Sequence, residues 1–145
     1  MERFLRVLPQ EGLTVSEKTF DTWLSALDLD FWGTGQHKVT LERVLSALEQ
    51  GEEAPLVLDV RTPEEQRYWA LPFAQVIPLH ELPARWQELP RERVIAVFCP
   101  GKVRASVAYA YLQSKGLANV RLLDARAGDL VETLNPGQVR KLAQG

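Results

Sequence analysis

The sequence predicts an α/β protein: a doubly wound, mostly parallel sheet with helices on both faces, preceded by an N-terminal helical extension. Two observations support this prediction. Short, continuously apolar runs of the kind that form buried parallel strands recur along the chain. Between them lie segments whose apolar residues recur at helical spacing, and this alternation is typical of a sheet covered on both faces. We expect the extension and a linker over residues 1–36, and one main domain over residues 37–145.

Composition sets limits on the class of protein. The chain has 145 residues, of which 46% are hydrophobic, enough for one compact domain and a short extension. Its formal net charge of -2 gives no reason to expect nucleic acid or an anionic membrane as a partner. The single cysteine excludes an intrachain disulfide framework. No long uncharged apolar stretch is typical of a membrane span or secretory signal, so we expect a cytoplasmic location.

The extension is predicted to contain a helix that begins after a possible cap at Ser16. Its apolar residues at helical spacing are Phe20, Trp23, Leu24 and Leu27. Periodicity is lost over residues 28–36, where Gly33 and Gly35 indicate a loop or linker. The aromatic residues of the extension are expected to pack on the core, with contact to a partner as the alternative.

The main domain is expected to begin with a helix that Thr40 caps and Gly51 ends. A buried strand follows over residues 56–60. The next helix has a strong start signal, because Thr62 stands at the N-cap, Pro63 at the first helical position and Glu65 completes a capping box. The remaining elements are predicted as strands over residues 75–77, 94–98 and 120–123 and as helices over residues 82–89 and from 103 onward. The tail over residues 129–142 is predicted as one or two helices, broken at residues 135–137.

The only cysteine, Cys99, stands at the end of an apolar strand and begins the stretch CPGKVR. After it, apolar or small residues recur at helical spacing, and Gly116 is expected to end the helix. They are Val103, Val107, Ala110 and Tyr111. The thiol therefore faces a helix N-terminus, where unpaired N–H groups and the helix dipole favour the reactive thiolate. A lone cysteine is more often a small buried hydrophobe, but ligands bind at the carboxyl ends of parallel strands, which favours a functional Cys99.

The loop over residues 99–104 is suited to hold an anion, since its successive N–H groups can point inward around the sulfur. Lys102 and Arg104 either pair with a sulfur oxyanion or lie solvated on the surface. Gly101 either allows a positive φ or is an ordinary turn residue. Pro100 removes one N–H donor and stiffens the loop. The expected substrate-binding residues are Gly101, Lys102, Val103 and Arg104.

Four motifs occur in order along the chain. They are LDVRTPEE at residues 58–65, IPL at 77–79, VFC at 97–99 with a loop that ends in RAS at 104–106, and GLANV at 116–120. Together they resemble the rhodanese family of single-domain sulfurtransferases over about residues 39–130. The resemblance implies a rhodanese-like domain in which Cys99 takes up sulfane sulfur as a persulfide. It also implies that Asp59 helps to hold the loop and that Arg61 makes a structural ion pair.

The chain departs from the family pattern in the loop itself. The family has a basic residue after the cysteine and glycine at the fourth position, where this chain has Pro100 and Lys102, with its glycine at Gly101. The family's Gly-Gly pair after the last strand appears as Ala125-Arg126. Cys99 and Arg104 are separated by four residues, one fewer than in phosphatases of this fold, and the shorter loop fits sulfur better than phosphate.

We therefore expect a thiosulfate-type sulfurtransferase that moves sulfane sulfur from thiosulfate or a persulfide donor to cyanide or a thiol through a Cys99 persulfide. Its partners would be a small sulfur donor and acceptor or a thiol protein, and it would need no metal or organic cofactor. The alternative is a non-catalytic rhodanese-like module that regulates or binds a protein. His37 and His80 stand in no catalytic motif and are expected to be structural or solvated.

Overall fold

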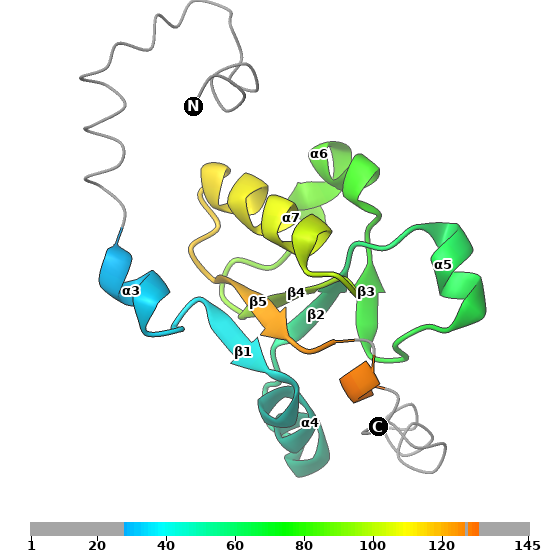
Figure 1. Cartoon of the computed structure of the whole chain (residues 1–145), viewed down its shortest axis with the longest axis horizontal. Coiled ribbons are helices and arrows are strands. Elements are labelled where there is room, and N and C mark those ends of the chain that lie inside the picture. Colours follow the sequence, from blue (N-terminus) through cyan, green and yellow to red (C-terminus); the bar gives the residue numbers. More distant parts are fainter. Residues whose placement is uncertain (1–27, 127, 131–145) are drawn as a thin grey trace, which may run out of the picture. The chain divides into compact units, whose positions relative to one another are not determined.

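The computed structural model describes residues 28–126 and 128–130 (Figure 1). The chain divides into two units, Met1–Gly35 and Gln36–Gly145. The helix expected from Ser16 lies outside the described residues, as does most of the helical tail expected over residues 129–142.

The described part of the first unit contains a short helix, α3 (Leu29–Gly33), where the sequence predicted a loop. Asp28 caps it, because its carboxylate accepts a hydrogen bond of 3.0 Å from the N–H of Phe31. The rings of Phe31 and Trp32 meet edge to face with their centroids 6.2 Å apart. A helix of five residues is too short to show a helical period, which explains why the sequence did not reveal it.

The second unit is built on a five-stranded sheet in the order β1-β5-β4-β2-β3 (Figure 1). Its strands are β1 (Lys38–Thr40), β2 (Leu56–Asp59), β3 (Ala74–Val76), β4 (Ile95–Phe98) and β5 (Val120–Asp124). Every pairing between these strands is parallel. The mostly parallel sheet predicted from the sequence is therefore confirmed, and β4 lies at its centre.

Strand β1 was not predicted. It is an edge strand of three residues, of which Lys38 and Thr40 are exposed. Its pairing comes from the distant β5, where Lys38 stands opposite Leu122 and Thr40 opposite Asp124. So short and polar a segment carries no strand pattern of its own, and it pairs because the neighbouring strand presents free backbone groups.

The helices of this unit are α4 (Leu41–Gln50), α5 (Pro63–Tyr68), η1 (Leu79–Glu81), α6 (Leu82–Arg85), η2 (Trp86–Glu88) and α7 (Val103–Ser114). The predicted ends of α4 are confirmed, because Thr40 accepts from the N–H of Arg43 and Gly51 adopts a φ of 68° after the last turn. The helix predicted over residues 82–89 is confirmed only in part, because the stretch forms the short α-helix α6 followed by the 3-10 helix η2. Pro83 lies in the first turn of α6, where proline is tolerated, and Pro90 follows the end of the stretch. In the described ranges, no helix is long and apolar enough to cross a membrane.

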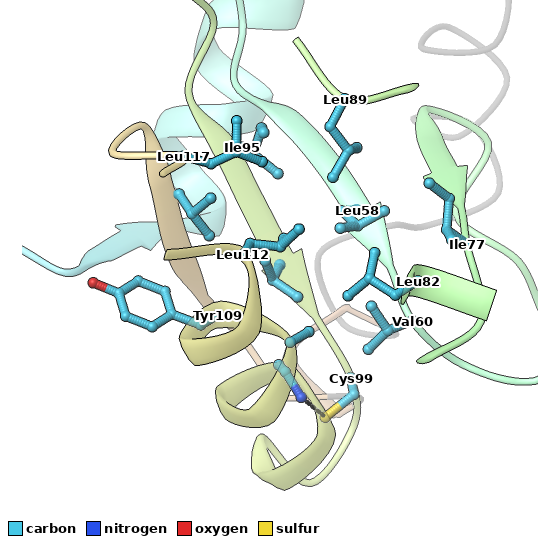
Figure 2. Packing of buried hydrophobic residues seen from close by; sticks show 14 residues of the cluster. Leu58, Val60, Ile77, Leu82, Leu89, Ile95, Cys99, Tyr109, Leu112 and Leu117 are labelled. Carbon is cyan, nitrogen blue, oxygen red and sulfur yellow. Dashed lines mark hydrogen bonds between the residues drawn. The ribbon is translucent and has the colours of Figure 1, made fainter. Parts of the chain in front are cut away.

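Buried side chains form one hydrophobic cluster on each face of the sheet. The first cluster includes Leu58, Ile77, Leu82, Ile95, Cys99, Ala108, Leu112 and Val120 and lies under α6 and α7 (Figure 2). The second includes Leu41, Val44, Val57, Ala96, Phe98 and Leu123 and lies against α4. Because side chains alternate along a strand, Phe98 and Cys99 belong to opposite clusters. Helices thus cover both faces, as the sequence predicted.

Helix α7 buries a different stripe from the one that predicted it. Its buried residues are Ala105, Ala108, Tyr109 and Leu112. Val103 is 73% exposed and Val107 is 53% exposed, although both belong to the apolar repeat. Two alanines on the inner side let the helix approach the sheet closely, and this leaves an apolar stripe facing solvent.

Candidate active site

Cys99 directly follows β4, the central strand, at the carboxyl edge of the sheet. It is a free thiol and is only 2% exposed. Figure 2 shows it at the end of the first hydrophobic cluster, beside the first turn of α7. The strand-to-helix position predicted for this residue is therefore the position it takes.

The sulfur of Cys99 accepts a hydrogen bond from the start of α7. The N–H of Ala105 donates to Sγ over 3.2 Å (Figure 2). Ala105 lies in the first turn, where N–H groups have no partner inside the helix. The side chain of Lys102, at the N-cap position, makes no capping hydrogen bond, so the cysteine sulfur serves the helix end instead. This N–H group and the positive end of the helix dipole stabilise negative charge on sulfur.

The backbone of the loop is strained at Lys102. This residue adopts a φ of 64° and is the one non-glycine residue with positive φ in the part of the chain that the structure describes. A side chain in this left-handed region costs about 1–2 kcal/mol. Gly101 has no positive φ, so of the two alternatives for this residue the structure supports an ordinary turn residue. The positive φ falls one residue later, at Lys102. The carbonyl of Lys102 then accepts from the N–H of Ser106 over 2.9 Å as α7 begins.

The amine of Lys102 is bonded to a carboxylate at the end of the neighbouring strand. Its Nζ donates to Oδ1 of Asp124 over 2.5 Å. This hydrogen bond is the main cause of the lowered pKa of Asp124, to which the charges of Lys38 and Arg126 also contribute. Lys102 thus ties the loop after β4 to the end of β5.

The guanidinium of Arg104 is likewise bonded to a carboxylate, that of Glu65 on α5. Nη1 donates to Oε2 over 2.6 Å and Nη2 donates to Oε1 over 2.8 Å, a two-pronged contact between residues 39 positions apart. These hydrogen bonds lower the pKa of Glu65 to about 2 and raise that of Arg104.

Sequence reasoning identified Glu65 as a helix cap but missed its contact with the loop. The cap is confirmed: Thr62 accepts from the N–H of Glu65, and Oε2 of Glu65 accepts from the N–H of Thr62 over 2.9 Å. The same carboxylate reaches Arg104 because α5 and α7 begin at the same edge of the sheet. Only the order of the strands could have revealed this proximity.

Asp59 and Arg61 form a buried ion pair beside the loop. The side chains are 0% and 1% exposed, and Nη2 of Arg61 donates to Oδ2 of Asp59 over 2.7 Å. The Arg61 guanidinium lies 3.7 Å from the ring centre of Trp69 and 5.7 Å from that of Phe98. Asp59 holds its own turn by accepting from the N–H of Arg61. Through Arg61, the pair contacts Phe98, the residue that precedes Cys99.

The site therefore combines a buried thiol, the first N–H groups of a helix and two loop cations already bonded to carboxylates. Of the predicted site residues, Cys99, Lys102 and Arg104 gather at one sheet edge, and Val103 points into solvent. Within residues 28–126 and 128–130, no group of three or more His, Cys, Asp or Glu residues is placed to hold a metal ion. The chemistry that the site around Cys99 can support is nucleophilic attack by sulfur.

Comparison with known proteins agrees with this geometry. The family model of the rhodanese-like domain matches residues 40–125, more than half of the chain. The chain belongs to the rhodanese-like domain family. A sulfurtransferase of Allochromatium vinosum is 36% identical over 76 residues, which cover 52% of this chain and 69% of that protein.

Two solved structures illustrate the similarity of this rhodanese-like protein to others. A human single-domain sulfurtransferase is 25% identical with a TM-score of 0.56, over 68% of this chain and 97% of the human one. A rhodanese-related protein of Thermoplasma volcanium is 27% identical with a TM-score of 0.54, over 66% of this chain and 91% of that one. The family resemblance found in the sequence and the predicted fold class are thus confirmed.

Proposed function

We propose that this rhodanese-like protein is a sulfurtransferase that carries sulfane sulfur as a persulfide on Cys99. The observation that carries the proposal is the 3.2 Å hydrogen bond from the N–H of Ala105 to Sγ of Cys99, because it places a nucleophilic sulfur at a helix N-terminus. The named sulfurtransferases among its relatives support the same reaction class.

The reaction divides into two half-reactions. In the first, the Cys99 thiolate attacks the outer sulfur of a donor, the donor's S–S bond breaks, and its electron pair leaves with sulfite or with a thiolate. In the second, an acceptor such as cyanide or a thiolate attacks the outer sulfur of the Cys99 persulfide. That step forms thiocyanate or a new persulfide and returns the Cys99 thiolate.

The donor would lie against the loop that follows Cys99. The first N–H groups of α7 have no partner inside the helix, so they can bind negative charge that develops on the transferred or leaving sulfur. The residues proposed to bind substrate are Gly101, Lys102, Val103 and Arg104. Asp59 and Arg61 would support the loop through Phe98. Small sulfur donors and acceptors or a thiol protein are the proposed partners, and a cytoplasmic location stays a prediction.

Intact mass spectrometry tests the proposal. Wild-type protein incubated with thiosulfate or with a small persulfide should gain the mass of one sulfur atom, and cyanide should remove it. The Cys99→Ala variant should show neither change, because no other residue in the chain is a cysteine. If the folded wild type gains no sulfur from either donor, the protein is instead a binding or regulatory module that uses the same loop without turnover.

A further inference from the structure

The two cations of the loop after Cys99, Lys102 and Arg104, are both hydrogen-bonded to carboxylates of the same protein. The Nη1 and Nη2 edge of Arg104 is bonded to both oxygens of Glu65, over 2.6 and 2.8 Å. The amine of Lys102 is bonded to Asp124 over 2.5 Å. Each positive group thus has a carboxylate in direct contact, and a second anion that approached the same atoms would be repelled by that carboxylate.

The residue after the nucleophile removes a further means of binding an anion. Pro100 has no N–H group and no charge, and it stands between Cys99 and the turn of the loop. Two apolar side chains at the start of α7 are exposed next to the loop, since Val103 is 73% exposed and Val107, one turn further along α7, is 53% exposed. A substrate with a carbon skeleton can cover these side chains, whereas a small inorganic anion cannot.

Thiosulfate and organic persulfides differ in the negative charge that the site must stabilise during sulfur transfer. Thiosulfate is a dianion, so its reaction with a thiolate brings three negative charges together and expels sulfite as a dianion. An organic persulfide reacts as neutral R–S–SH and expels a thiolate with one negative charge. The N–H groups at the start of α7 can bind that single charge, but the dianion also needs cations whose hydrogen bonds are directed at it.

We propose that this site accepts sulfur from organic persulfides in preference to thiosulfate, and that Glu65 and Asp124 determine this preference by holding Arg104 and Lys102. The proposal rests on the proposed function. The Cys99 thiolate attacks the outer sulfur of R–S–SH, and a new S–S bond forms at Sγ. The S–S bond of the donor breaks, its electron pair leaves as R–S⁻, and the proton stays on the transferred sulfur.

Glu65→Gln is the most direct test of the preference. Glutamine serves in a capping box as glutamate does, so the start of α5 is retained while the negative charge beside Arg104 is removed. Sulfur loading of Cys99 is followed by rapid quenching and intact mass, with thiosulfate and with glutathione persulfide. The rate ratio of thiosulfate to persulfide should rise about fivefold, the equivalent of one half-exposed charge interaction of about 1 kcal/mol.

Asp124→Asn provides an independent second test, because it frees Lys102 on the other side of the loop. In this variant too, the rate ratio of thiosulfate to persulfide should rise about fivefold. Glu64→Gln is the matched control: Glu64 is exposed, is adjacent to Glu65 in the first turn of α5, and carries the same charge. The rate ratio in Glu64→Gln should equal that of the wild type. This result would show that the change in Glu65→Gln comes from the contact with Arg104 and not from the loss of one negative charge.

The outcomes distinguish this inference from the proposed function. If neither donor loads sulfur on wild-type Cys99, the proposed function fails. If both load and the ratio stays unchanged or falls in folded Glu65→Gln and Asp124→Asn, the inference fails and the carboxylates position the cations for the donor. A short peptide that carries a cysteine persulfide, compared with glutathione persulfide, shows whether the organic donor is a protein or a small thiol.

Discussion

Two helices of this protein begin at the same edge of the sheet, but only one of them has its N-terminal N–H groups capped by side chains of its own first turn. Helix α5 follows β2 and α7 follows β4, and these neighbouring strands are in register, with Asp59 opposite Phe98. The start of α5 is closed by its own sequence, because Thr62 and Glu65 bond to each other's N–H groups. The start of α7 has no such cap, and the sulfur of Cys99 accepts one of its N–H groups.

The difference separates a helix start that stabilises the fold from the helix start at which the proposed reaction would take place. Beside the capped helix, Asp59 and Arg61 are fully buried, and Arg61 donates to Asp59, to the carbonyl of Trp69 and to Oε1 of Gln66. Beside the uncapped helix, the backbone is strained at Lys102, and N–H groups that a side chain could have used remain for a sulfur atom. Glu65 links the two regions, since it caps one helix and bonds to Arg104 of the other.

The largest loss of stability is expected in the capped region. Asp59→Ala should lower the free energy of unfolding by about 3–5 kcal/mol, because it leaves the Arg61 guanidinium buried without its carboxylate. Urea unfolding measures the loss. The matched control is Glu81→Ala, which removes a carboxylate from the half-exposed pair with Arg85 and should cost less than about 1 kcal/mol. Equal losses of unfolding free energy in the two variants would show that the buried Asp59–Arg61 pair stabilises the protein no more than the half-exposed Glu81–Arg85 pair does.

In the strained loop, a substitution by glycine is expected to give a more stable protein than the same substitution by alanine, and the difference is smaller than the loss in Asp59→Ala. Lys102→Gly and Lys102→Ala both remove the amine bonded to Asp124, but only glycine relieves the φ of 64°. The strain of about 1–2 kcal/mol outweighs the extra chain entropy of glycine of about 0.5–1 kcal/mol, so the glycine variant should be the more stable. Thermal unfolding of the two variants provides the comparison.

The control for this prediction lies in α7, the helix that follows Lys102. Ala110 is exposed in the middle of α7, where replacing alanine with glycine should destabilise the protein by up to about 1 kcal/mol. A Lys102→Gly variant that is less stable than Lys102→Ala would mean that the loop does not hold this residue in the left-handed region.

The smallest effect concerns the residue that links the two regions. Glu65→Gln should lower the free energy of unfolding by about 0.5–1 kcal/mol near neutral pH, since solvent screens a half-exposed pair. The folded pKa of Glu65 is about 2 against an ordinary value of 4.5, so the stabilisation is present above about pH 4.5 and is lost as pH falls towards 2. The difference between wild type and variant should therefore shrink as the pH falls from about 4.5 to about 2. A difference that grows on acidification would contradict the assignment of the low pKa to the Arg104 pair.

Local signals predicted the capped region well. The spacing of Thr62, Pro63 and Glu65 predicted the start of α5, and Thr40 with Gly51 predicted both ends of α4. These features depend on residues three or four positions apart, so the sequence contains all the information that forms them. The linker expected over residues 28–36 was wrong at α3, because a helix of five residues is too short to show a period. The helix expected over residues 82–89 was confirmed only in part, since it consists of α6 followed by η2.

The sequence by itself determined the alternation of strands and helices, the caps of α4 and α5, and the place of Cys99 at the end of a strand before a helix. Only the tertiary structure decided the partners of the loop cations. Glu65 lies 39 positions from Arg104, and Asp124 lies 22 positions from Lys102. A contact between distant residues depends on which strands are neighbours and on where each helix begins, and this order follows from packing of the whole sheet rather than from any local pattern.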